Sequence, residues 1–157
     1  MIPLTITSIG DERLLRMARE FMLNQPQFYP SHREWVDGKC VPRIEEGRYR
    51  SLAALHRGSV IGVAIYEILP GGKIEIKNFR IDRTYQRRDL GHFLLTQAEV
   101  ESGCSSVGLD VTVNNFPAVQ FFIRNGFEIR NICELYLPGQ LEYVMEKTVA
   151  ASRIPKP

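Results

Sequence analysis

The sequence has few cysteines, little net charge and no long hydrophobic run, and each shortage excludes a class of protein. Cys40, Cys104 and Cys133 are widely spaced and outside any CxxC pattern, so neither a disulfide framework nor a zinc site is indicated. A net charge of +2 argues against nucleic acid or an anionic membrane as the main partner. The longest apolar stretch, residues 60–69, is too short for a bilayer span, so we expect no membrane helix.

Signals for export, internal repeats and low-complexity tracts are also missing. The first residues contain no basic segment leading into an apolar run, which argues against a signal peptide. With 157 residues, of which 44% are hydrophobic, the chain has the size of one domain with its own core. We therefore expect a single domain over residues 1–150 and a loose tail over 151–157, in the reducing environment of the cytoplasm.

The first half of the chain predicts one helix and a series of strands. After a short strand, Asp11 can cap a helix whose apolar residues recur at helical spacing until Pro26. A less regular region over 27–47 follows, with a second helix around 33–37. The next three strand-like runs are joined by glycine-containing turns typical of hairpins, so they should pair antiparallel. The expected strands cover residues 3–8, 50–55, 59–69 and 73–82.

The second half predicts a crossover between parallel strands. Its first helix should bury Leu90, Phe93, Leu94 and Ala98, and the strand after it alternates cleanly between apolar and other residues. Short joints between strand, helix and strand imply a parallel pair within a mixed sheet. The expected elements are helices over 89–101 and 117–124 and strands over 107–113, 127–136 and 141–148.

The strand over 73–82 changes its apolar face partway along. Ile74 and Ile76 have one parity, whereas Phe79 and Ile81 have the other. Because side chains alternate strictly along a strand, this switch requires either an extra residue or burial of both faces. A β-bulge near residues 77–78 is the simpler solution.

The joint between this strand and the next helix combines the features of a phosphate site. A helix N-terminus presents unpaired N–H groups and the positive end of the helix dipole. Arg87 and Arg88 add positive charge just before it, and Gly91 lets the backbone approach a ligand. An ordinary solvated arginine turn is the alternative interpretation.

The same joint resembles the acetyl-CoA motif of the GNAT superfamily of N-acyltransferases, written Q/R-x-x-G-x-G/A. Gln86 matches the first position and Gly91 the last, and Ile81 stands where the family has an apolar residue ending a bulged fourth strand. The resemblance is specific over residues 74–127. It implies an α/β fold with a mixed sheet of about seven strands, about four helices and a splayed parallel pair. The family's downstream pattern is matched by Asn115, Ala118, Phe121, Asn125, Gly126 and Phe127.

The resemblance also implies how the acyl donor, an acetyl-CoA, is held. Backbone groups of Phe79, Arg80 and Ile81 should pair with the pantetheine arm as an added strand would. Asn115 either hydrogen-bonds near the pantetheine or orients the following helix. The pyrophosphate should lie against the backbone N–H groups of Arg87, Arg88, Asp89, Leu90, Gly91 and His92.

Glu75 occupies the place that, in several members of the family, holds the carboxylate that takes a proton from the acceptor amine. An ammonium has no lone pair, so it must lose a proton before it attacks a thioester. A solvated carboxylate between two isoleucines is the alternative. The resemblance implies direct attack in a ternary complex without a metal, on an acceptor that is a small-molecule amine, a protein amino group or an aminoacyl-tRNA.

Two residues depart from the family pattern. Asp89 stands at the motif's first glycine, where a carboxylate would repel pyrophosphate, although it could instead serve as an N-cap. Phe122 lies in the cofactor region, at the position of a tyrosine that protonates the departing thiolate in many members. That role is then vacant, or filled by water or by another tyrosine such as Tyr136 or Tyr143.

Both departures favour the alternative to an enzyme, a non-catalytic GNAT-like module that binds CoA or a protein partner. The resemblance is also compatible with a homodimer without specifying one. His32, His56 and His92 are too scattered for a metal site and are expected to be ordinary surface or packed histidines. The aromatic residues of the irregular region, Phe28, Tyr29 and Trp35, either line an acceptor pocket or pack.

Overall fold

A computed structural model describes residues 4–86 and 89–149 of the chain. Its strands are β1 (Thr5–Ser8), β2 (Arg50–His56), β3 (Ser59–Leu69), β4 (Lys73–Ile81), β5 (Ser106–Thr112), β6 (Glu128–Glu134) and β7 (Leu141–Thr148). Its helices are α1 (Glu12–Leu23), α2 (His32–Trp35), η1 (Val36–Cys40), α3 (Val41–Glu45), η2 (Arg83–Tyr85), α4 (Leu90–Ser102) and α5 (Phe116–Arg124). The tail expected over 151–157 lies outside the described residues.

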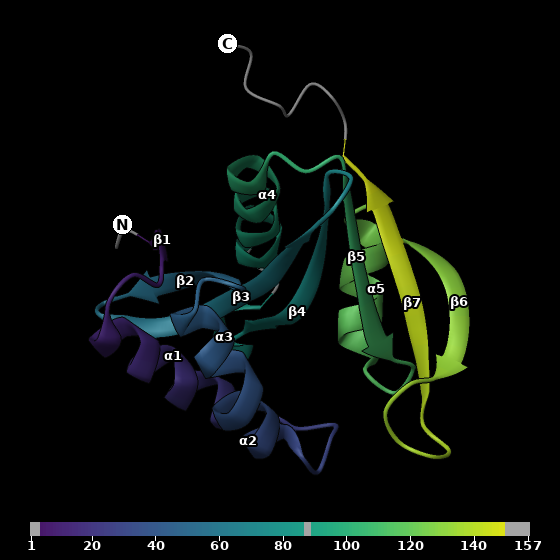
Figure 1. Cartoon of the computed structure of the whole chain (residues 1–157), viewed down its shortest axis with the longest axis horizontal. Helices are drawn as coiled ribbons and strands as arrows, with labels where there is room; N and C mark the ends of the chain where they lie inside the picture. Colours follow the sequence, from purple (N-terminus) through teal and green to yellow (C-terminus); the bar gives the residue numbers. More distant parts are fainter. Residues whose placement is uncertain (1–3, 87–88, 150–157) are drawn as a thin grey trace.

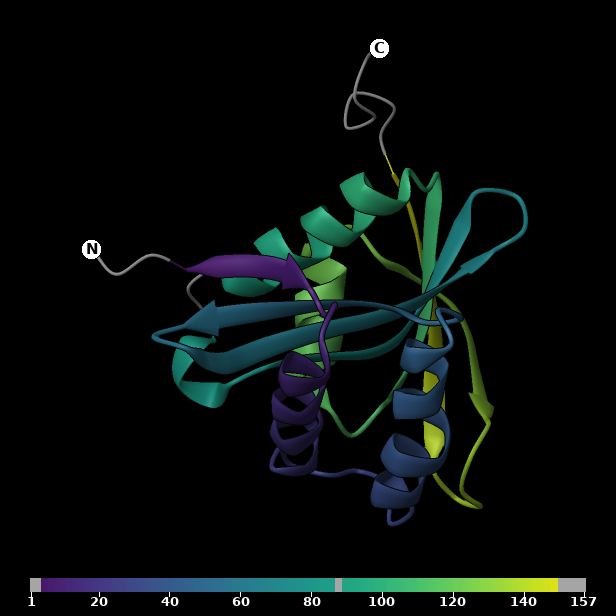
Figure 2. The ribbon, with the colours of Figure 1, turned by 60° about the vertical axis from the view of Figure 1, so that its left-hand side comes forward.

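The seven strands form one mixed sheet in the order β1-β2-β3-β4-β5-β7-β6. Helices α1 to α3 lie on one face of it, and α4 and α5 lie on the other (Figure 1, Figure 2). Each face has its own apolar cluster, one around Met22, Val63 and Ile65 and a larger one around Ile74 and Leu94. The expected fold class is confirmed. No helix within the described ranges combines the length and apolar character needed to cross a membrane.

The region over 27–47 is more helical than expected. A single helical run continues through α2, η1 and α3, and its middle segment is a π-helix. Gly38 and Pro42 make the sequence here read as irregular. Pro42 is tolerated because it lies at the start of α3, and the wider π turn before it is a usual way to fit an extra residue into a helix.

The bulge expected in β4 is present. Ile65 pairs with Asn78 and Tyr66 pairs with Ile76, which leaves Lys77 as the extra residue. Lys77 and Asn78 therefore both lie on the α1 face, where Asn78 Nδ2 contacts Met22 Sδ at 3.4 Å. The bulge keeps the isoleucines before it and Phe79 after it on the opposite, α4 face.

The expected parallel pair is short. β4 and β5 are paired only from Lys73–Ser106 to Glu75–Gly108, and beyond this point β5 continues alongside β7 alone. The second half of β4 thus diverges from β5 and opens the sheet at its centre (Figure 1). Glu75 is the last residue of β4 before the opening.

The inner face of α4 differs from the expectation at one position. Leu90, Leu94 and Ala98 are buried as expected, but the side chain of Phe93 is 57% exposed and Leu95 is buried in its place. The inner stripe of this helix is wide enough to run through Leu94 and Leu95, so Phe93 falls at its edge. Its ring lies instead against that of His92.

Candidate functional site

The opening between β4 and β5 leads into a cleft of about 1800 Å³. Most residues expected at the CoA site line this cleft. They are distant in the sequence and come from β4, α4, α5 and the loops before these helices. Leu90, the first residue of α4, does not line the cleft because its side chain is buried in the apolar cluster under the helix. Arg87 and Arg88 lie outside the described residues. The lining residues of the expected set are Glu75, Phe79, Arg80, Ile81, Gln86, Asp89, Gly91, His92, Asn115 and Phe122.

Two polar side chains of this set fix local structure. Gln86 Nε2 donates to the carbonyl of Ile81 at 3.0 Å, which ties the loop after β4 to the end of that strand. Asn115 Oδ1 accepts from the Ala118 N–H at 3.4 Å and so caps α5. The structure thus shows Asn115 in the second of its two expected roles, that of orienting the helix.

Asp89 begins α4 without capping it through its side chain. Its backbone is left-handed, with φ 59° and ψ 3°, and its carboxylate accepts no capping hydrogen bond from the described part of the helix. The alternative role expected for this residue, a side-chain cap, is therefore wrong. Asp and Asn visit this region more readily than other non-glycine residues, which explains how Asp89 replaces a glycine here.

Gly91 has a steric reason to be a glycine. A Cβ at this position would lie 2.7 Å from Cε2 of Phe121, so the missing side chain lets α4 and α5 approach each other. Phe121 belongs to an aromatic cluster with Phe79, Phe122 and Phe127, whose neighbouring ring centroids are 5.2–5.8 Å apart. Phe122 is buried in this cluster and supplies packing rather than an acidic group.

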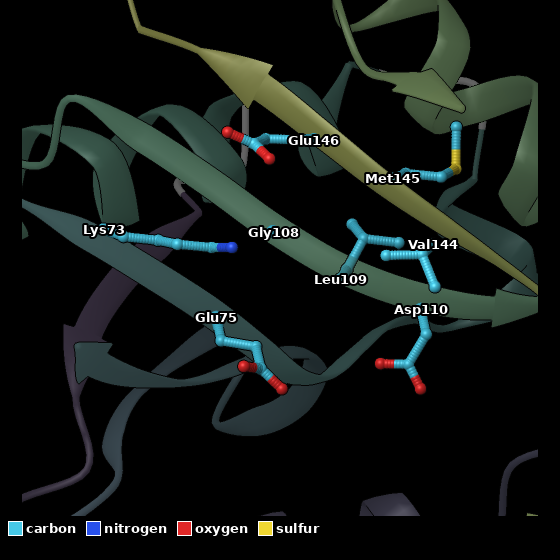
Figure 3. A pocket seen from close by; sticks show the side chains of 8 residues that line it. All are labelled: Lys73, Glu75, Gly108, Leu109, Asp110, Val144, Met145 and Glu146. Carbon is cyan, nitrogen blue, oxygen red and sulfur yellow. The ribbon is translucent and has the colours of Figure 1, made fainter. Parts of the chain in front are cut away.

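Glu75 lies on the sheet face opposite that cluster. Its carboxylate Oε1 accepts from Lys77 Nζ at 2.8 Å, and the same ammonium lies 3.7 Å from Glu67. The Glu75 side chain is 33% exposed. It borders both the large cleft and a smaller hollow of about 130 Å³ that it shares with Asp110 (Figure 3). Glu75 is thus accessible from the opening and already holds one cationic partner.

Two acidic residues that were not expected at the site, Asp110 and Glu142, lie close to Glu75, and Asp110 lines the cleft. Asp110 accepts a hydrogen bond from the Tyr136 hydroxyl, and Glu142 accepts one from the Tyr29 hydroxyl. The two tyrosine rings meet edge to face, with their centroids 5.7 Å apart. Two acid–tyrosine pairs therefore stand side by side on the face that carries Glu75.

Burial raises the pKa of both carboxyl groups, Asp110 and Glu142, above the usual values, and their mutual repulsion adds to the shift of Glu142. Burial and the adjoining carboxylates also raise the pKa values of Tyr29 and Tyr136, so both phenols stay protonated. The outward parity of Asp110 in an alternating strand was a readable signal. Both tyrosines were candidates from the sequence, Tyr29 for an acceptor pocket and Tyr136 as an alternative acid, but nothing in the sequence indicated their carboxylate partners.

The remaining candidates behave as packed or cleft-lining residues. His32 is buried and its ring nitrogen Nε2 lies 3.3 Å from the Met22 carbonyl, while burial lowers its pKa. Tyr143, expected as one alternative acid, packs against the apolar cluster on the α4 face. No group of potential metal ligands occurs within the ranges that the structure describes. Phe28, Tyr29 and Trp35 all line the cleft.

Known proteins are similar to this chain in sequence or in fold. Spermine/spermidine N(1)-acetyltransferase of Bacillus subtilis is 26% identical over 113 residues, which cover 64% of this chain and 68% of that protein. A structure from Desulfovibrio desulfuricans, described as a GNAT-family acetyltransferase, superposes with a TM-score of 0.82 at 16% identity and covers 94% of this chain and all of its own.

The PaiA N-acetyltransferase of Thermoplasma acidophilum, solved in complex with coenzyme A, gives a TM-score of 0.70 at 20% identity and covers 94% of this chain and 100% of its own. The family model of the acetyltransferase (GNAT) family matches residues 14–127. That match includes the bulged strand, the opening beside it and the helix that begins at the cleft. The chain therefore belongs to the acetyltransferase (GNAT) family and is a GNAT-type N-acetyltransferase.

Proposed function

We propose that the protein transfers an acetyl group from acetyl-CoA to a primary amine by direct attack in a ternary complex. The observation that carries this proposal is the unpaired edge of β4. Beyond Glu75–Gly108, the described residues provide no strand partner for β4 on the β5 side. An extended amide-containing arm such as pantetheine can pair with this edge, and we assign that pairing to the backbone groups of Phe79, Arg80 and Ile81.

The part of the cleft at the start of α4 suits the pyrophosphate of the donor. Helix α4 presents its N-terminus to the cleft at Asp89 and Gly91, and backbone N–H groups at a helix N-terminus attract phosphate. A neighbour of the same fold is solved with coenzyme A, which supports a CoA-type donor. The thioester would then lie near Glu75, where the two central strands separate.

The reaction follows from this arrangement. Glu75 takes a proton from the acceptor ammonium, and the freed amine nitrogen attacks the thioester carbonyl. The carbon–sulfur bond then breaks to release the CoA thiolate, and the attacking nitrogen gives up its second proton to water as the amide forms. Phe122 has no proton to give, and burial raises the pKa of Tyr136, whose hydroxyl already donates to Asp110. We therefore assign the protonation of the thiolate to water. The bacterial relative named above acts on spermine and spermidine, both of which carry primary amines, and this supports an amine acceptor.

The test is an acceptor screen. Purified protein is incubated with acetyl-CoA and a panel of small amines, peptides and polyamines, and release of free CoA thiol is measured. We expect release that depends on both the protein and an amine. Tight acetyl-CoA binding by calorimetry without thiol release from any amine would instead support the non-catalytic module.

A further inference from the structure

We propose that the acid–tyrosine pairs Asp110–Tyr136 and Glu142–Tyr29 bind a second ammonium group of the acceptor, so that the preferred substrate is a diamine or polyamine. This inference rests on the proposed function, because it assigns the reacting amine to Glu75. It adds the residues that would hold the rest of the acceptor.

The three carboxylates lie in a row on one sheet face. Glu75 on β4 pairs with Gly108 of β5, and Asp110 lies two residues farther along β5. Thr112 follows two residues after Asp110, and its partner on β7 is Glu142. Two residues of strand span about 7 Å, so successive carboxylates are spaced by roughly that distance at the backbone. Figure 3 shows the side chains of Glu75 and Asp110 projecting to the same side of their strands. A row of this kind suits a chain that carries more than one positive charge.

The cations of the protein leave this row incompletely neutralised. Lys77 is engaged by Glu75 and Glu67. Within the described ranges, neither Asp110 nor Glu142 has a Lys or Arg nitrogen within 4.0 Å. Their hydrogen-bond donors are the neutral phenols of Tyr136 and Tyr29. Two acids close to each other without a cation are unfavourable in the free protein, and a bound ammonium would relieve that repulsion.

Glu142 provides an independent indication of a ligand. Its side chain has no exposed surface, and yet its Oε2 atom has no hydrogen-bond partner among the described residues. Thr112 and Gln140 are hydrogen-bonding neighbours of this carboxyl group, yet Oε2 of Glu142 and Nε2 of Gln140 both lack a partner of normal hydrogen-bond geometry among the described residues. Tyr29, which donates to the other oxygen, lines the cleft, and so does Thr112, the strand partner of Glu142. Buried acceptors are rarely left unpaired, and an ammonium with its three donors can satisfy this one.

The tyrosines suit the same ligand. Their rings meet edge to face, with centroids 5.7 Å apart, and each hydroxyl contacts one of the two carboxylates. One tyrosine belongs to the loop before α2 and the other to the loop before β7. An ammonium or a protonated amine chain is attracted to aromatic faces and gains more when it is desolvated. Together the four side chains offer negative charge, hydrogen-bond acceptors and aromatic surface to one cation.

The experiment compares spermidine and putrescine with n-butylamine, which has a single amine. KM and kcat are measured with saturating acetyl-CoA for the parent, Asp110→Asn and Glu142→Gln, with Glu128→Gln as the control because that carboxylate is exposed on β6. We expect Asp110→Asn to raise the KM for spermidine and putrescine about ten- to a hundredfold, the usual cost of losing a charged hydrogen-bond partner. The KM for n-butylamine and all kcat values should change little.

Two further measurements separate the outcomes. Thermal unfolding shows that each variant is folded. Tyr136→Phe keeps the aromatic ring and leaves the Asp110 carboxylate in place, so this variant should retain most of the affinity for spermidine. Calorimetry of spermidine binding without acetyl-CoA tests the site apart from the reaction. If no amine releases thiol but Asp110→Asn abolishes spermidine binding, the cation site stands and the proposed function fails. If both amine classes react with equal KM in all variants, the cation site is overturned and the proposed function stands.

Discussion

The ammonium of Lys77 lies 2.8 Å from the carboxylate of Glu75, and Lys77 is the extra residue of the bulge in β4. The residue that turns the strand away from β5 therefore also neutralises the carboxylate at the start of the opening. Lys77 reaches Glu67 as well, at 3.7 Å, and its ammonium lies 6.0 Å from the centre of the Tyr49 ring. Its position is thus held by three neighbours, and Glu75 itself lines the cleft.

Replacing Glu75 tests its role as the base. Glu75→Gln should lower kcat by roughly 10²–10⁴-fold, the usual range for loss of a general base, because the amide cannot accept the ammonium proton. The affinity for CoA, measured by calorimetry, should remain nearly unchanged. Glu67→Gln is the matched control, because Glu67 pairs with Glu75 across the strands and shares Lys77 with it. Equal turnover of Glu75→Gln and the parent at every pH would exclude Glu75 as the base.

Asp89 should weaken the binding of the donor. If pyrophosphate lies at the start of α4, the Asp89 carboxylate adds like charge near it, and its removal should tighten CoA binding by ~1 kcal/mol or somewhat more. Asp89→Asn suits this test because asparagine tolerates the left-handed backbone at φ 59° and no side-chain cap is lost. Calorimetry should show the gain shrinking as salt is added. Unchanged or weaker affinity at low salt would place the phosphates elsewhere.

Glu142 should make stability depend on pH. Its folded-state pKa is raised by burial and by repulsion from Asp110, so the folded protein holds the proton more tightly than the unfolded chain does. This contribution to stability is fully present below the unfolded-state pKa of about 4.3 and is lost as the pH rises through the higher folded-state value. Glu142→Gln should therefore raise the free energy of unfolding at neutral pH by an amount on the order of 1 kcal/mol, or about 2–4 °C in Tm.

The gain in Tm should disappear as the pH is lowered toward 4, where Glu142 is protonated in both states. Differential scanning calorimetry from acidic to neutral pH checks this. The exposed acid variant Glu128→Gln should show no such trend. A Tm lowered by Glu142→Gln at neutral pH would mean that the ionised carboxylate stabilises the fold.

Local pattern in the sequence was enough to predict most of the architecture. The alternation of apolar residues, the turn residues and the cap at Asp11 predicted the elements, because these signals depend only on neighbours along the chain. The change of parity between Ile76 and Phe79 predicted the bulge that the structure places at Lys77. It did so because a strand has a side-chain period of two and an apolar face has to stay in the core.

Only the tertiary structure decided which distant residues meet. Tyr29 and Glu142 are separated by 113 positions, and nothing in the pattern around either indicates the other. Their contact depends on how the loop before α2 lies against β7, which is set by packing across the whole sheet. The same holds for Gly91, whose closeness to Phe121 is a property of two helices brought together. The sequence by itself thus determined the strands, the bulge and the family, whereas the acid–tyrosine pairs beside Glu75 arise only when the sheet has folded.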